Sequence, residues 1–226
     1  MTRRRVPWLA PGDSPARLPP AESALPDPPG LVAAGGALTP DWLLAAYRGG
    51  IFPWYSAGEP ILWWSPDPRC VLRPAAFHRR RSLVKAARNR GLSVQRDTDF
   101  AATIELCASA RETAGGTWIT AEMKAAYRAL AAAGFAHSVE IYAGEDLVGG
   151  LYGVQVGALF FGESMVSRVP DASKIALLSL CDTAAAAGIE LIDCQFPTDH
   201  LLSLGAEVWP RAEFLAAARR LTAPSA

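Results

Sequence analysis

Residues 191–200 contain a carboxylate, Asp193, and an amide, Gln195, directly after apolar residues that are typical of a buried strand. Side chains two residues apart on a strand point to the same face, so Asp193 and Gln195 are expected to stand side by side. A buried carboxylate is costly unless a partner or a function accounts for it. The pair either fixes a strand end or orients a nucleophile for reaction. Cys194 lies between them, so its thiol is expected to point into the core and not to act as a nucleophile.

A second carboxylate, Glu163, interrupts the apolar residues 160–165. It either faces solvent on an edge strand or belongs to a site in which apolar surroundings strengthen a hydrogen bond to a cation. The four cysteines form no CxxC pair, and no histidine lies at ligand spacing from them, so we expect neither a metal site nor a disulfide framework. Only His200, just past the strand segment, is a histidine that merits a test.

Basic side chains gather in residues 68–95, which contain no Asp or Glu although the formal net charge of the chain is zero. A helix over residues 81–89 places basic side chains on one face at helical spacing. Such a face can follow the phosphates of a nucleic acid, or it is an ordinary solvated helix. The residues expected on this face and at its entry are Arg79, Arg80, Arg81, Lys85 and Arg88.

Length and composition indicate a globular protein, because 226 residues with 50% hydrophobic side chains are enough for a substantial core. No segment reaches the length of a membrane span, and prolines interrupt the residues that follow the basic N-terminus, so no signal peptide is expected. These features predict a cytoplasmic protein with reduced thiols and no membrane contact.

These candidate residues need elements to position them, and the chain is expected to have three parts. A mostly irregular, proline-rich lead-in covers residues 1–29, a small N-terminal domain covers 30–74, and a larger domain covers 75–226. The order of elements indicates a mixed α/β fold. In the larger domain we expect helices over residues 81–89, 99–111, 121–133, 172–187, 198–204 and 211–221, and strands over residues 92–96, 139–143, 146–154, 158–166 and 189–194.

Taken together, four stretches resemble the bacterial leucyl/phenylalanyl-tRNA-protein transferases, and the likeness runs in the same order from about Gly30 to Leu221. The resemblance implies a small α/β N-terminal domain and a larger domain related to the N-acetyltransferase (GNAT) fold. It also implies an aminoacyltransferase of the N-end rule, which moves Leu or Phe from tRNA to the N-terminal Arg or Lys of a protein. The stretches are residues 50–54, 63–69, 162–165 and 191–200.

The resemblance further implies the partners and the absence of a cofactor. Leu-tRNA and Phe-tRNA are the expected donors, proteins that begin with Arg or Lys are the expected acceptors, and the protein is expected to be a monomer. No metal, ATP or redox cofactor is expected, because the ester bond of the donor already stores the driving force.

Site residues follow from the family positions. The expected catalytic residues are Asp193, Gln195 and Glu163, of which Glu163 holds the amine of the acceptor. An amide oxygen is a poor base, so our hypothesis is that Gln195 aims the amine at the ester while Asp193 locks the amide. The expected substrate-binding residues are the aromatic Trp54, Trp118 and Phe160 around the terminal adenine and the aliphatic Leu151, Leu177, Leu180 and Ile192 around the donor side chain.

Leu180 departs from relatives that carry Phe at this position, so the shape of the donor pocket is expected to differ. A pocket that discriminates by a few methylenes separates substrates by about 1–3 kcal/mol, so some transfer of Met is expected as well.

Two other interpretations stay open from the sequence. A GNAT-type acyltransferase that uses acyl-CoA requires a glycine-rich turn for the pyrophosphate, and we find none in the sequence. A non-catalytic RNA-binding module explains the arginines but not a carboxylate and an amide on a buried strand.

Overall fold

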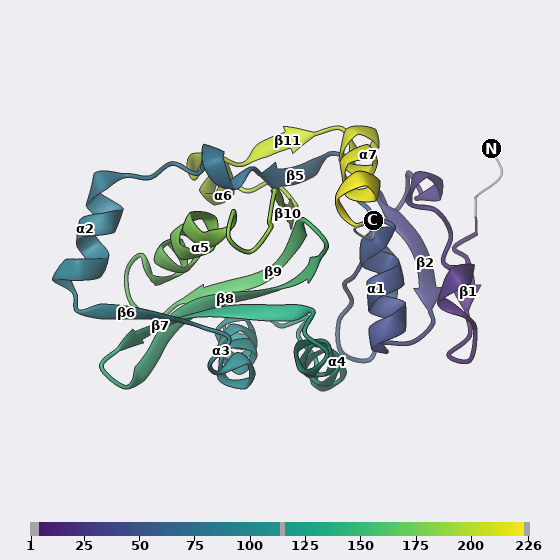
Figure 1. Ribbon diagram of the computed structural model, residues 1–226. Helices are drawn as coiled ribbons and strands as arrows, with labels where there is room; N and C mark the ends of the chain where they lie inside the picture. Colours follow the sequence, from purple (N-terminus) through teal and green to yellow (C-terminus); the bar gives the residue numbers. More distant parts are fainter. Residues whose placement is uncertain (1–4, 114–115, 224–226) are drawn as a thin grey trace.

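A seven-stranded sheet forms the centre of the computed structural model, which describes residues 5–113 and 116–223 (Figure 1). Its strands are β5 (Arg69–Leu72), β6 (Leu92–Arg96), β7 (Ala136–Ala143), β8 (Asp146–Val156), β9 (Leu159–Ser167), β10 (Leu191–Gln195) and β11 (Glu207–Trp209). The order across the sheet is β11-β5-β10-β9-β8-β7-β6. Strands β9 and β10 run parallel to each other, whereas the other neighbouring pairs are antiparallel. The mixed α/β class expected from the sequence is thereby confirmed.

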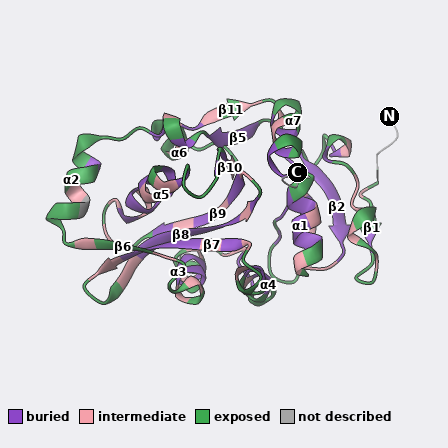
Figure 2. Ribbon diagram, in the orientation of Figure 1, coloured by how far each residue is buried: buried purple, intermediate pink, exposed green. Residues whose placement is uncertain are grey.

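Helices cover both faces of this sheet and so bury its apolar side chains (Figure 1). Helices α3 (Phe100–Thr113) and α4 (Ala121–Ala132) pack on one face, and α5 (Ala172–Thr183) packs on the other. Burial is concentrated in β8, β9 and the sheet-facing side of α5, whereas α2 (Arg81–Asn89) is mostly exposed at the edge (Figure 2). Two short elements complete this part, the helices α6 (Asp199–Ser203) and η3 (Pro74–Ala76).

A second, four-stranded sheet in the order β1-β2-β4-β3 lies beside helix α1 (Pro40–Arg48) and helix α7 (Arg211–Leu221) (Figure 1). Helix α1 begins with a proline in its first turn and ends at Gly49, and Gly50 then takes a φ of 71°, which favours glycine. Its buried face includes Trp42 and Tyr47. The strands are β1 (Trp8–Leu9), β2 (Leu31–Gly35), β3 (Phe52–Pro53) and β4 (Leu62–Trp64).

The lead-in and the first boundary differ from what the sequence suggested. Residues 5–29 supply β1 and the short helices η1 (Pro15–Arg17) and η2 (Ala21–Ser23), and Leu9 and Leu25 are buried, so this segment packs onto the fold. Residues 1–4 lie outside the described part. Strand β5, which the expected boundary at residue 74 placed in the N-terminal domain, pairs with β10 and β11 in the large sheet.

Candidate active site

A cavity of about 460 Å³ opens where β9 and β10 part. The register of these parallel strands pairs Leu159 with Leu191 and Phe161 with Asp193, and no later pair joins them although both strands continue. Ligands commonly bind beyond the carboxyl ends of parallel strands that diverge in this way, and the volume suits a small group. The lining includes Phe52, Trp54, Arg111, Trp118, Leu151, Tyr152, Phe160, Glu163, Ser164, Met165, Leu177, Leu180, Ile192, Cys194, Gln195, Phe196 and His200.

Glu163 enters the cavity from a β-bulge in β9. Gly162 pairs with Gly153 and Ser164 pairs with Tyr152, so Glu163 is an extra residue on its strand. Bulges turn a side chain out of the regular alternation and occur beside active sites. The alternation of β9 alone therefore does not predict where this carboxylate points.

Two tyrosine hydroxyls hold the carboxylate of Glu163. The Tyr47 hydroxyl donates to Oε1 and the Tyr127 hydroxyl donates to Oε2, each at 2.7 Å. Burial away from water raises the pKa of Glu163 to about 7, and the hydrogen bonds from the tyrosines offset part of this rise. The carboxyl group therefore changes charge near neutral pH.

Asp193 is fully buried and forms a bidentate ion pair with Arg69. The guanidinium Nε and Nη2 atoms of Arg69 donate to the two carboxylate oxygens at 2.8 and 2.7 Å. The rings of Phe52 and Phe214 lie 4.9 and 4.4 Å from this guanidinium. Asp193 is not among the described residues that line the cavity, so it faces away from the position expected beside Gln195.

Gln195 reaches the cavity because its backbone leaves the strand. Its φ is 58°, a left-handed conformation that is uncommon for this residue type, and the pairing of β10 with β5 is irregular between Asp193 and Gln195. The Gln195 backbone N–H donates to Asp193 Oδ1 at 3.0 Å. Asp193 thus fixes the backbone of Gln195 rather than its side-chain amide, which corrects our hypothesis. The amide Nε2 is buried and has no hydrogen-bond partner in the described part of the chain.

Cys194 packs against the apolar core cluster that includes Leu177 and Leu180, as expected, but it also lines the cavity, which was not expected. The alternation along β10 places Asp193 and Cys194 on opposite faces, and Asp193 faces Arg69. A hydrogen bond to Cys70, together with burial, raises the pKa of the Cys194 thiol well above its ordinary value. The thiol is therefore protonated near neutral pH, which agrees with the expectation that it is no nucleophile.

Aromatic side chains form the mouth of the cavity. Trp54 is 42% exposed, and its ring lies 5.9 Å from that of Trp64 and 5.7 Å from that of Phe196. Trp118 lines another part of the wall, where the guanidinium of Arg111 lies 5.8 Å from its ring. Two aromatic faces are thus reachable from outside.

The inner wall of the cavity is apolar. Its side chains come from β8, β9, β10 and α5, and each of them is nearly fully buried. Phe160, expected at the adenine, is 1% exposed and lies in this inner wall. The seven residues expected to bind substrate all line the cavity: Trp54, Trp118, Phe160, Leu151, Leu177, Leu180 and Ile192.

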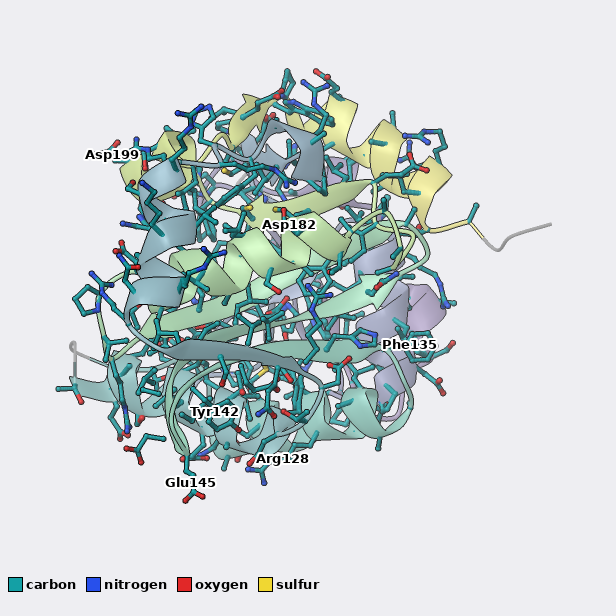
Figure 3. The ribbon with its side chains drawn as sticks, turned by 60° about the vertical axis from the view of Figure 1, so that its left-hand side comes forward. Arg128, Phe135, Tyr142, Glu145, Asp182 and Asp199 are labelled. Carbon is teal, nitrogen blue, oxygen red and sulfur yellow. The ribbon has the colours of Figure 1, made fainter. Side chains whose placement is uncertain are left out.

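The basic residues lie apart from the cavity, on α2 and the segment before it. Arg79 pairs with Asp182 of α5. Among the described residues, the other four form no ion pair and are exposed: Arg80, Arg81, Lys85 and Arg88. Figure 3 shows Asp182 on the α5 side of the large sheet, whereas Arg128 of α4 lies on the other side.

Three polar residues of this site were missed in the sequence: Arg69, Tyr47 and Tyr127. Arg69 lies in the basic stretch 68–95, but it is buried, whereas the basic side chains of α2 are exposed. Tyr47 lies on the buried face of α1 among apolar residues, so its hydroxyl does not stand out in the sequence. No local signal connects these residues to β9 and β10, because the contacts span 36 to 124 positions of the chain.

The described residues contain no group of three His, Cys, Asp or Glu side chains that could hold a metal ion. They also contain no helix long and apolar enough to cross a membrane.

The larger part of the chain shares its fold with FemX. The crystal structure of FemX aligns with 64% of this chain and 60% of its own, at 13% identity and a TM-score of 0.51. A GCN5-related N-acetyltransferase from Kribbella flavida aligns with 76% of this chain and 61% of its own, at 12% identity and a TM-score of 0.41. The larger part of this chain thus has the fold of FemX, and its cavity is apolar with a carboxylate and an amide beside it.

Sequence comparison identifies the class of the protein, an acyltransferase, together with its family. Residues 71–219 match the model of the leucyl/phenylalanyl-tRNA protein transferase, and residues 36–67 match the model of its N-terminal domain. The chain belongs to the leucyl/phenylalanyl-tRNA protein transferase family. The resemblance seen in the sequence is confirmed, and family membership favours an aminoacyltransferase over the acyl-CoA enzyme and the RNA-binding module.

Curated relatives with this name match nearly the whole chain. The leucyl/phenylalanyl-tRNA–protein transferase of Azoarcus sp. (strain BH72) is 58% identical over 96% of this chain and 91% of its own length. The protein of the same name from Pseudomonas entomophila (strain L48) is 57% identical over 92% of each chain.

Proposed function

We propose that this enzyme transfers Leu or Phe from Leu-tRNA or Phe-tRNA to the N-terminal Arg or Lys of acceptor proteins and so creates a degradation signal. The observation that carries this proposal is a cavity in which an apolar inner wall, an aromatic mouth and a carboxylate meet. The reaction is aminolysis of an ester, in which a C–N bond replaces the C–O bond to the tRNA.

The apolar inner wall suits the side chain of the donor amino acid. Leu151, Leu177, Leu180 and Ile192 line it and offer no hydrogen-bonding side chain, so Leu, Phe and Met fit by shape and hydrophobicity. At the mouth, Trp54 and Trp118 can stack the terminal adenine of the tRNA, which is worth about 1–3 kcal/mol per base.

The acceptor amine approaches Glu163 and Gln195. Glu163 holds the cationic amine, because it is the carboxylate among the described lining residues. The amide oxygen of Gln195 accepts a hydrogen bond from the amine and so directs it to the ester carbonyl, and Asp193 acts through the Gln195 backbone as a positioning residue.

The exposed basic face of α2 contacts the phosphates of the tRNA outside the cavity, through Arg80, Arg81, Lys85 and Arg88, with Arg79 at the entry. We further propose that the enzyme acts as a monomer in the cytoplasm, without a cofactor.

Transfer of radiolabelled leucine from Leu-tRNA tests the proposal directly. The acceptors are one protein that begins with Arg, Lys or Ala in three otherwise identical versions. We expect label on the Arg and Lys versions and none on the Ala version. Label on none of them, with tRNA still bound, would contradict the proposal.

A further inference from the structure

Three contacts of 2.7 Å join Glu163 and two buried tyrosines in a closed set. Toward the ionised Glu163, the hydroxyls of Tyr47 and Tyr127 each donate their one hydrogen to one carboxylate oxygen, so no hydrogen lies between the two hydroxyl oxygens. When Glu163 is protonated, its own hydrogen allows all three contacts to be hydrogen bonds. The three residues come from α1, α4 and β9, which are far apart in the sequence. Both tyrosines are completely buried, so these contacts occur without competition from bulk water.

The hydrogen bonds leave the carboxylate available to a ligand. Each oxygen receives one donor from within the protein, and each carboxylate oxygen can accept a second. Glu163 lines the cavity, whereas Tyr47 and Tyr127 do not, so the tyrosines hold it from behind. An incoming amine in the cavity therefore meets a carboxylate of fixed orientation.

Other charged and titratable groups around Glu163 lie on three further strands and one helix. They are Tyr152 of β8, Asp193 of β10, Arg69 of β5 and Arg111 of α3. The positive charge of Arg111 offsets part of the rise in the pKa of Tyr152. Asp193 raises the pKa of Glu163 and Arg69 lowers it, after the larger effects of burial and the two tyrosines. Since Asp193 and Arg69 are themselves paired, their effects on Glu163 oppose each other.

We propose that Glu163 is the general base that takes the proton from the attacking α-ammonium group, and that Tyr47 and Tyr127 are positioning residues that hold its carboxylate. This inference rests on the proposed function and adds a chemical step to it. In this proposal Glu163 takes the proton and Gln195 only orients the amine, because an amide is too weak a base for this step.

The acceptor arrives as an ammonium ion. One proton passes from its nitrogen to a Glu163 oxygen, and the freed lone pair forms the C–N bond to the ester carbonyl carbon. The C–O bond to the ribose then breaks, and the ribose oxygen takes the proton from the Glu163 carboxylic acid. A second proton leaves the nitrogen for solvent, which gives the amide and a free ribose hydroxyl.

The pKa supports this role, because a base is most effective when its pKa lies near the working pH. Burial raises the pKa of Glu163 to about 7, close to that of an α-amino group at about 8. A proton can therefore move between the two groups at little cost.

The test is the pH dependence of kcat/KM, measured from about pH 6 to about pH 9 with Leu-tRNA and an acceptor that begins with Arg. The wild-type rate should rise with a midpoint near 7, the pKa of Glu163. Glu163→Gln should lose about 10²–10⁴-fold at neutral pH and recover only as the amine loses its own proton near about pH 8. Hydrolysis of the donor is measured in parallel and subtracted.

The tyrosine variants give a readout that a purely structural role does not move. Both hydroxyls lower the pKa of Glu163, so Tyr127→Phe and Tyr47→Phe should each shift the rising limb to higher pH. Tyr55→Phe is the matched control, because Tyr55 is buried and its hydroxyl contacts Thr120 at 3.4 Å without lining the cavity. The rising limb of the pH profile of Tyr55→Phe should have the same midpoint as that of the wild type.

Two results would overturn the inference. One is a Glu163→Gln profile that is lowered equally at all pH values, which would indicate only a binding role. The other is a rising limb that stays in place in both tyrosine variants while their rates fall. Failure of the wild-type enzyme to transfer leucine at any pH would instead overturn the proposed function.

Discussion

The guanidinium of Arg69 donates two hydrogen bonds to the carboxylate of Asp193, at 2.8 and 2.7 Å, and both side chains are fully buried. This pair holds the end of β10, because the same carboxylate accepts the backbone N–H of Gln195. The geometry of Gln195 in the cavity thus depends on an arginine from a different strand.

Arg69→Leu should destabilise the protein strongly, because it leaves Asp193 as an unpaired buried charge. Loss of one partner of a buried ion pair typically costs about 3–5 kcal/mol. Arg73→Leu, which breaks the exposed pair with Glu207, should cost no more than about 1 kcal/mol. Urea denaturation of both variants measures the difference, and equal losses would show that burial of the pair is unimportant.

Gln195→Gly should remove the side-chain amide and keep the left-handed backbone conformation, so that the effect of the amide alone can be measured. Glycine adopts the φ of 58° without strain, so the free energy of unfolding should change by no more than about 1 kcal/mol. Transfer of leucine should nevertheless fall by about 10²-fold, because nothing orients the amine. Retention of activity in Gln195→Gly would remove the side chain from the mechanism, whereas Gln195→Glu should keep part of it.

Leu180→Phe should change the choice between donors. The added ring fills part of the apolar inner wall, so kcat/KM for Phe-tRNA should fall relative to Leu-tRNA by about 10- to 200-fold. Leu178→Phe is the matched control, since Leu178 is buried on the same helix but does not line the cavity. Competition between the two donors in one reaction gives the ratio, and an identical ratio in both variants would count against this pocket.

Lys85→Gln combined with Arg88→Gln should weaken tRNA binding in a salt-dependent way. Each lost phosphate contact should reduce the slope of log Kd against log salt by about 0.7–0.9. Arg128→Gln, on the opposite side of the large sheet, should leave this slope unchanged (Figure 3). Filter binding at several salt concentrations measures the slopes. An unchanged slope in the double variant would show that α2 does not contact the phosphates of the tRNA.

Glu163 should make stability depend on pH in a predictable direction. Its pKa is 4.5 in an unperturbed carboxyl and about 7 in the folded protein, so folding favours its protonated form. Its contribution to stability is present below 4.5 and is lost as the pH rises through 7. The free energy of unfolding of Glu163→Gln minus that of the wild type should therefore increase across this window, by about 2–4 kcal/mol. A constant difference between the two proteins would show that the carboxyl is not perturbed.

Much of the fold followed from local patterns. The bounds of α2, β6 and α7 agree with the expected residues 81–89, 92–96 and 211–221, because Gly91 separates the first two elements and Pro210 directly precedes the third. Helix α5 ends at Thr183 instead of residue 187, since the alanines that follow form hydrogen-bonded turns before Gly188. Short strands such as β1 and β5 were not predicted, because they are defined by partners far away in the sequence.

The site was partly predictable from the resemblance to the family. The family positions placed apolar residues of α5 and β10 around the donor side chain, and these residues line the cavity. The orientation of Asp193 was not predictable, because it depends on a left-handed residue and on Arg69, 124 positions away. The role assigned to each residue stays a prediction until the variants above are measured.

The two rings that enclose Arg69 are 162 positions apart in the chain, Phe52 from β3 and Phe214 from α7. Because α7 is the last of the described elements to be synthesised, a growing chain that lacks it has only Phe52 over the arginine, so the pair that holds the end of β10 is covered on one side alone. On the proposed function, an unfinished copy of this enzyme is surrounded by charged tRNA at the ribosome. The late arrival of Phe214 would delay its activity until translation has passed α7.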